Sequence, residues 1–256
     1  MSRPRYNVVT ATEHGTFIVN RKDIGVGELL AANGACEPAE IVLFGAILQS
    51  LGRDDPLVLD IGANIGIRSV CLGEMAGPRG KVHAFEAQRI VFNMLAGNIA
   101  LNSLENVWCH HRAVGAAAGR IAIPQFDYTR HLSFGSVEFG PRQVEEIGQK
   151  RRHDPATEET VEVVSIDSLG FPAVHFIKID VEGMELDVLR GAAQTIRRDM
   201  PVIYVEVLKC DRRAMARWLL DAGYRLFPNE YNWLCLPPAS SVVVQGVEEI
   251  FSDAGL

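Results

Sequence analysis

The chain has 256 residues, of which 48% are hydrophobic and 22% are charged, and its formal net charge is −7. This composition is typical of a folded globular protein and excludes a disordered chain. The net negative charge argues against nucleic acid as a partner, because a phosphate backbone attracts basic surfaces. No apolar run approaches the roughly 20 residues of a membrane-spanning helix, and residues 1–10 lack the apolar stretch of a secretory signal. We therefore expect a cytoplasmic protein without a membrane span.

The five cysteines are scattered, odd in number and without CxxC spacing. This pattern predicts neither a disulfide framework nor a zinc site. The length suits one large α/β domain, and we expect residues 1–256 to form that single domain. The sequence leaves a monomer and a homodimer equally open.

The N-terminal part, residues 1–50, precedes the regular pattern of the rest of the chain. It contains one short strand candidate, Thr16–Asn20, and two helical stretches, Asp23–Asn33 and Glu37–Leu51. Because these elements come before the first core strand, we expect them to form an N-terminal helical lid.

Residues 56–236 alternate between apolar strands and amphipathic helices. The expected strands are Pro56–Ile61, Lys81–Glu86, Val107–Val114, Ala173–Asp180 and Pro201–Val207, and the expected helices are Ile65–Met75, Gln88–Leu101, Met184–Ile196 and Asp211–Ala222. Alternation of this kind pairs strands in parallel through right-handed crossovers. It predicts a doubly wound, mostly parallel sheet with helices on both faces.

Two segments depart from this alternation. Leu226 and the aromatic stretch Tyr231–Leu236 predict a closing antiparallel hairpin. Residues 124–160 are polar and contain several prolines and charges. A loop of that length is usually functional or partly disordered, and we expect it to be a variable loop that shapes the substrate pocket.

The run VLDIGANIG, residues 58–66, lies between the first core strand and the first core helix. In an open α/β sheet, ligands bind outside the carboxyl ends of the strands, near the switch point. A dinucleotide-binding GxGxxG fails here, because Asn64 and Ile67 occupy its second and third glycine positions. A side chain at Asn64 would crowd a pyrophosphate, whereas S-adenosylmethionine brings only a small methionine tail. The run therefore favours S-adenosylmethionine.

We expect Asp60 to hold the ammonium group of that tail, directly or through water. Glu86 closes the second strand, 24 residues after Gly62, where an acidic residue accepts hydrogen bonds from ribose hydroxyls. The alternative is that both carboxylates only cap the helices that follow them. The remaining expected cofactor contacts are the backbone of Gly62, Ala63 and Asn64, the helix-packing Gly66, and Ala87, His111, Arg112, Ala113 and Asp180.

The run FIKIDVEGMELDVLRGA, residues 176–192, carries charges that are unusual for a core strand. Strand periodicity places Lys178, Asp180 and Glu182 on one face. A buried Lys178 needs a carboxylate, and we expect Glu206 on the next strand, or Glu182, to supply it. Asp180 ends its strand, where the reactive methyl group should point. The alternative for Lys178 and Glu182 is a purely structural ion network.

At these residues the chain resembles the FkbM family of methyltransferases. The runs DIGANIG, HAFEA, KIDVEGMELDVLRGA and PVIYVEV match the pattern of that family in order, within about residues 13–236. Ala87 departs from it, since the family usually has proline there. The resemblance implies a class I, Rossmann-like methyltransferase fold with S-adenosylmethionine as methyl donor. It also implies O-methylation of a sugar, glycan or polyketide-type natural product, with N-methylation of a small metabolite as the alternative.

A hydroxyl acceptor must lose its proton, so a general base is expected. Asp180 is the first candidate, followed by Glu206 and His175. A divalent cation shared by Asp180 and Glu206 is an alternative that we do not favour. The candidate substrate contacts are Lys178, Glu182, Tyr128, His131 and Phe134.

Two other functions compete with methyl transfer. A nicotinamide-dependent oxidoreductase is opposed by Asn64 and by the missing GxGxxG motif. A non-catalytic cofactor-binding protein of the same fold would have no need to keep Asp60, Glu86 and Asp180 together. The sequence does not identify the methyl acceptor.

Overall fold

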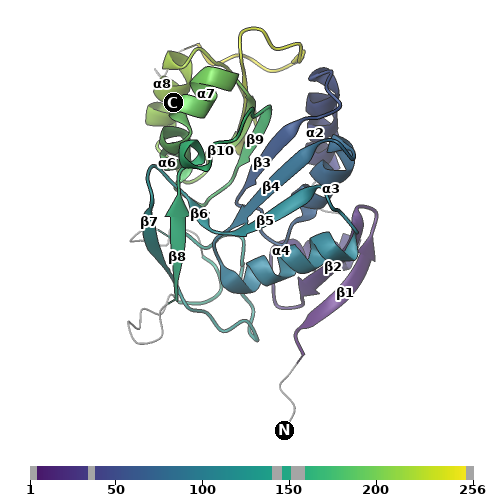
Figure 1. Ribbon diagram of the computed structural model, residues 1–256. Helices are drawn as coiled ribbons and strands as arrows, with labels where there is room; N and C mark the ends of the chain where they lie inside the picture. The colour runs from purple at the N-terminus through teal and green to yellow at the C-terminus, as the bar shows by residue number, and fades with distance from the viewer. Residues whose placement is uncertain (1–4, 34–37, 140–145, 151–158, 252–256) are drawn as a thin grey trace.

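The computed structural model describes residues 5–33, 38–139, 146–150 and 159–251. At its centre is a seven-stranded sheet in the order β11-β12-β10-β9-β3-β4-β5 (Figure 1). The parallel strands are β3 (Leu57–Ile61), β4 (Lys81–Glu86), β5 (Val107–His111), β9 (Phe176–Ile179) and β10 (Val202–Glu206). The antiparallel hairpin is β11 (Arg225–Asn229) and β12 (Asn232–Leu236). This confirms the predicted doubly wound, mostly parallel sheet with its C-terminal hairpin.

Helices cover both faces of this sheet because its strands are apolar on both sides. Val58 and Phe176 face one core, together with the helices α2 (Pro38–Ser50), α3 (Ile67–Ala76) and α4 (Arg89–Leu101). Their neighbours Leu59 and Ile177 face the other core. That second core contains α5 (Ile166–Leu169), α6 (Glu185–Gly191), α7 (Ala193–Asp199) and α8 (Arg212–Asp221). The predicted helix 184–196 is thus two helices, which meet at Ala192.

The N-terminal part is mostly not a lid. The Phe44 ring of α2 makes edge contacts with Phe176 and Tyr204 in the sheet, at centroid distances of 5.3 and 5.2 Å. An expected lid helix is therefore a layer of the core. Upstream, β1 (Asn7–Thr12) and β2 (Gly15–Asn20) form a hairpin that lies against α4 (Figure 1). Asn98 on α4 accepts a hydrogen bond from Ile18 N at 2.5 Å.

A second, three-stranded sheet lies beside the carboxyl end of β5. It consists of β6 (Ala113–Val114), β8 (Glu159–Val164) and β7 (Gly119–Ile123), in that order. The predicted strand 107–114 therefore breaks at Arg112, and its last residues pair with β8 instead of β4. The partner strand lies some 50 residues further along the chain, so local periodicity did not reveal this sheet.

Two sequence-based expectations concern the chain as a whole. The cysteines within the described residues, Cys71, Cys109, Cys210 and Cys235, are all free and are buried or half-buried. Among the described helices, none combines the length and the apolar character needed to cross a membrane. The short α1 (Val26–Asn33) is the remaining helix and lies near the site described next.

Candidate active site

A cavity of about 220 Å³ lies at the carboxyl ends of β3, β4 and β9, where the strand order reverses. This is the position at which open α/β sheets bind ligands. Its walls come from the segments that follow these strands and from residues 133–139. The predicted site residues that line this cavity are Gly62, Ala63, Asn64, Glu86, Ala87, Arg112, Ala113, Lys178, Asp180, Glu182 and Glu206.

The loop after β3 packs directly against the end of β9. Gly62 has a φ of +80°, and a Cβ there would lie 1.7 Å from the carbonyl oxygen of Asp180. The Gly62 and Ala63 amides both donate to Phe85 O, at 3.0 and 2.9 Å. The Asn64 amide donates to Glu86 Oε2 at 3.0 Å. We expected the backbone of this loop to contact the cofactor, but these amides are engaged within the protein, so the loop contributes shape rather than free donors.

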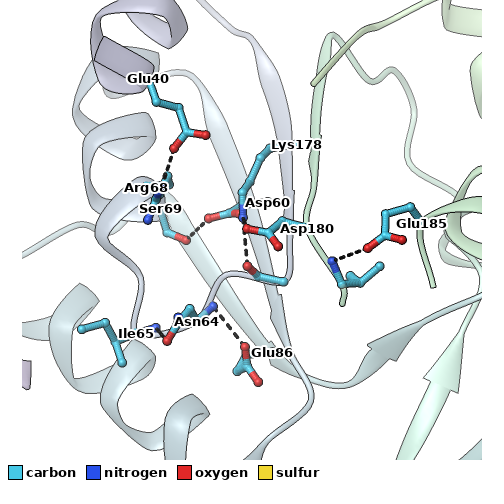
Figure 2. Close-up of polar contacts among 12 residues, drawn as sticks. Glu40, Asp60, Asn64, Ile65, Arg68, Ser69, Glu86, Lys178, Asp180 and Glu185 are labelled. Atoms are coloured by element: carbon cyan, nitrogen blue, oxygen red, sulfur yellow. Dashed lines mark hydrogen bonds and ion pairs between the residues drawn. The ribbon is translucent and has the colours of Figure 1, made fainter. Parts of the chain in front are cut away.

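Glu86 is the buried carboxylate of this cavity. Its Oε1 accepts from Gln88 N at 2.7 Å. Its Oε2 accepts from Asn64 N, as Figure 2 shows. Burial raises the pKa of Glu86 to about 7, although these two amides oppose the rise. A carboxylate oxygen can accept more than one hydrogen bond, so both oxygens keep capacity for a ligand. The arrangement fits a bound pair of hydroxyl groups.

Gln88 is a cavity residue that sequence reasoning missed. Its Nε2 donates to Phe134 O at 2.8 Å, whereas its Oε1 is buried without a partner among the described residues. A buried acceptor without a partner is costly unless a ligand or water satisfies it. The available signal was its position, two residues after the acidic end of β4.

Asp60 lies beneath the cavity and not in its wall. The side chain has no exposed surface, and it accepts a hydrogen bond from Ser69 Oγ at 2.5 Å. Lys178 Nζ lies 3.4 Å from Asp60 Oδ1 (Figure 2). We expected Asp60 to hold a ligand ammonium group directly or through water, but its side chain does not line the cavity and pairs with Lys178. Asp60 instead balances the charge of the lysine.

Lys178 connects the two loops of the site. Its Nζ donates to Gly62 O at 2.9 Å and lies 3.4 Å from Asp180 Oδ2. Burial acts to lower the pKa of Lys178, but Asp180 and Asp60 together hold it above its ordinary value, so the side chain is a cation. The predicted partners Glu206 and Glu182 were wrong. The strand register pairs Lys178 with Asp60 on β3 and with Tyr204 on β10, which puts Asp60 within reach.

Asp180, Glu182 and Glu206 form an acidic cluster at the edge of the cavity. Each offers a carboxylate oxygen within 4.8 Å of the other two. The structure thus brings together the predicted pair Asp180 and Glu206 and adds Glu182, which forms an ion pair with Lys209. Burial, and next the charge of Asp180, raise the pKa of Glu206 to about 8 and that of Glu182 to about 9.

A second cavity, of about 660 Å³, adjoins the first. Its walls come from α2, from the β11–β12 hairpin and from residues 242–247. Arg68, Asp180 and Glu206 line both cavities. Arg68 Nε donates to Glu40 Oε2 at 2.6 Å, and burial raises the pKa of Glu40 to about 7. The acidic cluster therefore lies where the two cavities meet.

The long loop and the start of α1 together cover the first cavity. The buried Asp23 accepts from the Gly25 and Gly27 amides at 3.1 and 3.0 Å and from Phe134 N at 3.4 Å. Gly25, Val26, Ser133, Gly135, Ser136 and Val137 line the cavity. These are the positions of the expected lid and loop that line a cavity, and it is the first cavity, not the second. Residues 140–145 and 151–158 of the predicted loop lie outside the described residues.

The loop residues proposed as substrate contacts line neither cavity. Phe134 is fully buried in the core, and the Tyr128 ring packs on it at a centroid distance of 5.0 Å. His131 is exposed beside Lys22 and Glu28. Aromatic character indicated the wrong positions here, because the small residues next to Phe134 form the cavity wall instead.

His175 lies at the opposite edge of the sheet from Asp180. It precedes β9, and its Nδ1 accepts from Leu57 N, at the start of β3, at 2.9 Å. The structure thus contradicts its proposal as a general base, since it sits at the amino end of a parallel strand and the cavity is at the carboxyl end.

Two of the expected cofactor contacts, His111 and Gly66, do not line the first cavity. His111 Nε2 is hydrogen-bonded to Ala87 O at 3.1 Å, and its ring stacks on Phe92, so it supports the turn after Glu86 from outside the cavity. A Cβ on Gly66 would lie 2.5 Å from the Leu95 side chain, which agrees with its expected role in close helix packing.

The order of the sheet and the cavity at its switch point define the class I methyltransferase fold. The crystal structure of methyltransferase FkbM from Methylobacillus flagellatus KT is similar, with a TM-score of 0.51 and 19% identity. It matches over 71% of this chain but only 43% of that one. Residues 60–226 match the methyltransferase FkbM domain model. The chain belongs to that family and is a methyltransferase.

Curated relatives support the same activity. Methyltransferase sdnD of Sordaria araneosa is 28% identical over 70% of this chain and 77% of its own length. Methyltransferase 1 of Beauveria bassiana is 27% identical over 70% and 76%. The hexuronic acid methyltransferase AglP of Haloferax volcanii is 28% identical over 59% and 56%.

Proposed function

We propose that the protein transfers a methyl group from S-adenosylmethionine to a hydroxyl oxygen of a sugar, glycan or polyketide-type molecule. One observation carries this proposal. Asp180 and Glu206 line both cavities at their junction, so a donor in the first cavity and an acceptor in the second would meet at these carboxylates. The fold and the family support S-adenosylmethionine as the donor.

The first cavity fits the parts of this donor. Glu86 accepts hydrogen bonds from the two ribose hydroxyls, as acidic residues at this position do in nucleotide-binding folds. Ala87, Arg112 and Ala113 line the space for the adenine ring. Because the amides after β3 are engaged, the guanidinium of Arg68 is the group that we assign to the carboxylate of the methionine tail.

Asp180 is the proposed general base. When bound, S-adenosylmethionine supplies a methyl group that is already electrophilic, so the protein has mainly to position the two reactants, about 3 Å apart and aligned. An Asp180 carboxylate oxygen would take the proton of the acceptor hydroxyl while the acceptor oxygen displaced the donor sulfur from the methyl group, and S-adenosylhomocysteine would leave as a neutral thioether. Lys178 Nζ, at 3.4 Å, forms an ion pair with that carboxylate and holds it in place.

The acidic cluster works without a divalent cation in this proposal. Lys178 lies beside Asp180, and Lys209 forms an ion pair with Glu182, so two of the three carboxylates already have a protein cation. Burial raises the pKa of the third, Glu206, to about 8, which favours its neutral form. The cluster is therefore compensated from within the chain.

Calorimetric titration of the purified protein with S-adenosylmethionine and with S-adenosylhomocysteine tests the donor assignment. We expect heat with both, and equal binding of NAD would contradict the assignment. Incubation with methyl-labelled donor and hydroxyl compounds then tests the transfer. Absence of binding of either donor compound would refute the proposed function as a whole.

A further inference from the structure

The lining of the second cavity indicates which kind of acceptor this protein binds, and most of that lining lies outside the family match. Only Arg68, Asp180, Tyr204 and Glu206 of its lining lie within the family match, residues 60–226. The rest comes from α2, from the β11–β12 hairpin and from residues 242–247. These segments lie outside the family match, so the chemistry of their side chains describes the acceptor beyond what that match shows.

Near its junction with the first cavity, the lining of the second cavity is rich in hydrogen-bond acceptors. Asp180, Glu206 and Glu40 line it, and the Tyr204 hydroxyl accepts from Asn229 Nδ2 at 3.0 Å. The Oε2 atom of Glu206 is buried without a partner among the described residues. Hydroxyl groups are donors that would satisfy such acceptors.

The charge of this lining opposes an anionic guest. Its acidic residues are Glu40, Asp180, Glu230 and Glu206, the last of which favours its neutral form. Its basic residue is Arg68, which is paired with Glu40 and, in the proposed function, also binds the donor carboxylate. Burial and the neighbouring Asp180 raise the pKa of Glu206, so the cavity already disfavours the charged form of one of its own carboxyls. A carboxylate brought in by a ligand would meet the same desolvation and repulsion.

Away from this junction, much of the lining of the second cavity is apolar. Leu43 on α2, Phe227 and Leu234 on the hairpin, and Val242 on the C-terminal segment line it. Three further lining residues are exposed at the rim: Tyr231 at 60%, Val243 at 78% and Val247 at 43%. Apolar side chains gathered at the rim of a polar cavity gain free energy when an apolar group of a ligand covers them.

We infer that the acceptor is an uncharged molecule with hydroxyl groups at one end and an apolar body at the other. The hydroxyl end lies against Asp180 and Glu206, and the apolar body lies against residues 242–247 and the hairpin. This deepens the proposed function and rests on it, because it assigns the second cavity to the acceptor. It also separates this chain from AglP, whose named acceptor is a hexuronic acid.

Three matched probes test the inference by calorimetry in the presence of S-adenosylhomocysteine. Hexyl β-glucoside is uncharged and amphipathic, hexyl β-glucuronide adds a carboxylate, and methyl β-glucoside lacks the apolar chain. We expect hexyl β-glucoside to bind at least about tenfold more tightly than either of the others, which corresponds to about 1.4 kcal/mol. Equal or tighter binding of the glucuronide or of methyl glucoside, relative to hexyl β-glucoside, would overturn the inference. Hexylamine is a further control that carries a positive charge in place of the sugar, and its binding more tightly than hexyl β-glucoside would also overturn it.

Paired variants locate the binding. Leu43→Glu places a charge in the apolar wall, and Val42→Glu places the same charge on the exposed outer side of the same helix, where Val42 is 72% exposed. We expect only Leu43→Glu to weaken hexyl glucoside binding, by about tenfold or more. Equal effects of the two changes would move the apolar body to another surface.

A second pair tests the charge. Glu230→Lys reverses a charge at the cavity rim, whereas Glu105→Lys does so before β5, at the amino edge of the sheet. We expect only Glu230→Lys to reduce the difference in binding affinity between hexyl β-glucuronide and hexyl β-glucoside. If no probe binds while S-adenosylhomocysteine does, this inference fails and the proposed methyl transfer stands. If S-adenosylhomocysteine also fails to bind, the proposed function fails first.

Discussion

The two cavities of this protein are built in different ways. The first is formed largely by residues that directly follow β3, β4, β5 and β9, and these stretches lie within the family match. The second is formed mostly by α2, the terminal hairpin and the C-terminal segment, which lie outside it. With the donor in the first cavity and the acceptor in the second, as proposed, donor recognition is held in short stretches inside the family match, while acceptor recognition is assembled from distant segments outside it.

Lys178 holds the loop after β3 to the end of β9, so replacing it should have the largest effect. It is buried and contacts Gly62, Asp60 and Asp180, so Lys178→Met leaves two carboxylates without their cation. We expect a loss of about 3–5 kcal/mol in the free energy of unfolding, the scale for breaking a buried ion pair. Urea unfolding measures it.

Lys81→Met is the control for that change, because Lys81 is exposed at the start of β4. It should alter stability by no more than about 0.5 kcal/mol. Similar losses in the two variants would show that Lys178 does not hold the loops together.

Asp180 lines both cavities, so replacing it should affect turnover and donor binding to different extents. Asp180→Asn removes the proposed base while keeping the size of the side chain. We expect kcat to fall by about 10²- to 10⁴-fold, the usual contribution of a general base, with donor affinity within about tenfold. Asp187→Asn, on an exposed carboxylate of α6, should leave both quantities unchanged. If Asp180→Asn also lost donor binding, Asp180 would be a donor-binding residue and not the general base.

Glu86 lines the first cavity and not the second, so replacing it should affect donor binding alone. Glu86→Gln should weaken S-adenosylhomocysteine binding by about 1–3 kcal/mol, the scale of hydrogen bonds to a charged group, and leave acceptor binding unaltered. A calorimetric dissociation constant equal to that of the unchanged protein would contradict its ribose contact.

The same residue predicts a pH dependence. The pKa of Glu86 is raised to about 7 by burial, and ribose hydroxyls donate to its charged form. Donor affinity should therefore fall as the pH drops through about 7 and level off above it. Glu182 and Glu206 also have raised pKa values, so the slope assigned to Glu86 is the part that disappears in Glu86→Gln. An identical slope in both proteins would exclude Glu86 as its source.

The smallest expected effect concerns metal ions at the boundary. Because lysines compensate Asp180 and Glu182, chelation with EDTA should leave turnover unchanged. Turnover that falls on chelation and returns with Mg²⁺ would instead make the acidic cluster a cation site.

The sequence was informative where an element and its function lie in one stretch of chain. The strands β3, β4, β9 and β10, the terminal hairpin and the approach of Glu86 and Asp180 to one cavity all followed from local patterns. The pairing of β6 with β8 did not, because it joins residues about 50 positions apart. Lys178 was matched to the wrong carboxylates for the same reason, since its register with Asp60 is a long-range property.

Side-chain chemistry alone was a poor guide in the loops. Tyr128 and Phe134 suggested substrate contacts, yet they build the core beneath the small residues that form the wall. His175 suggested a base, yet it precedes its strand and so lies at the far edge. Which edge of a parallel strand a residue occupies was readable from the sequence and would have excluded this histidine.

The contact of Gly62 with the Asp180 carbonyl limits how the enzyme can adapt. With no room for even a methyl substituent between them, the spacing of donor loop and base is set by main-chain packing rather than by rotamer choice. A new acceptor can be accommodated by exchanging side chains on α2, the hairpin or the C-terminal segment without disturbing that spacing. Attempts to redirect this enzyme should therefore leave the β3–β9 junction untouched and diversify those three segments.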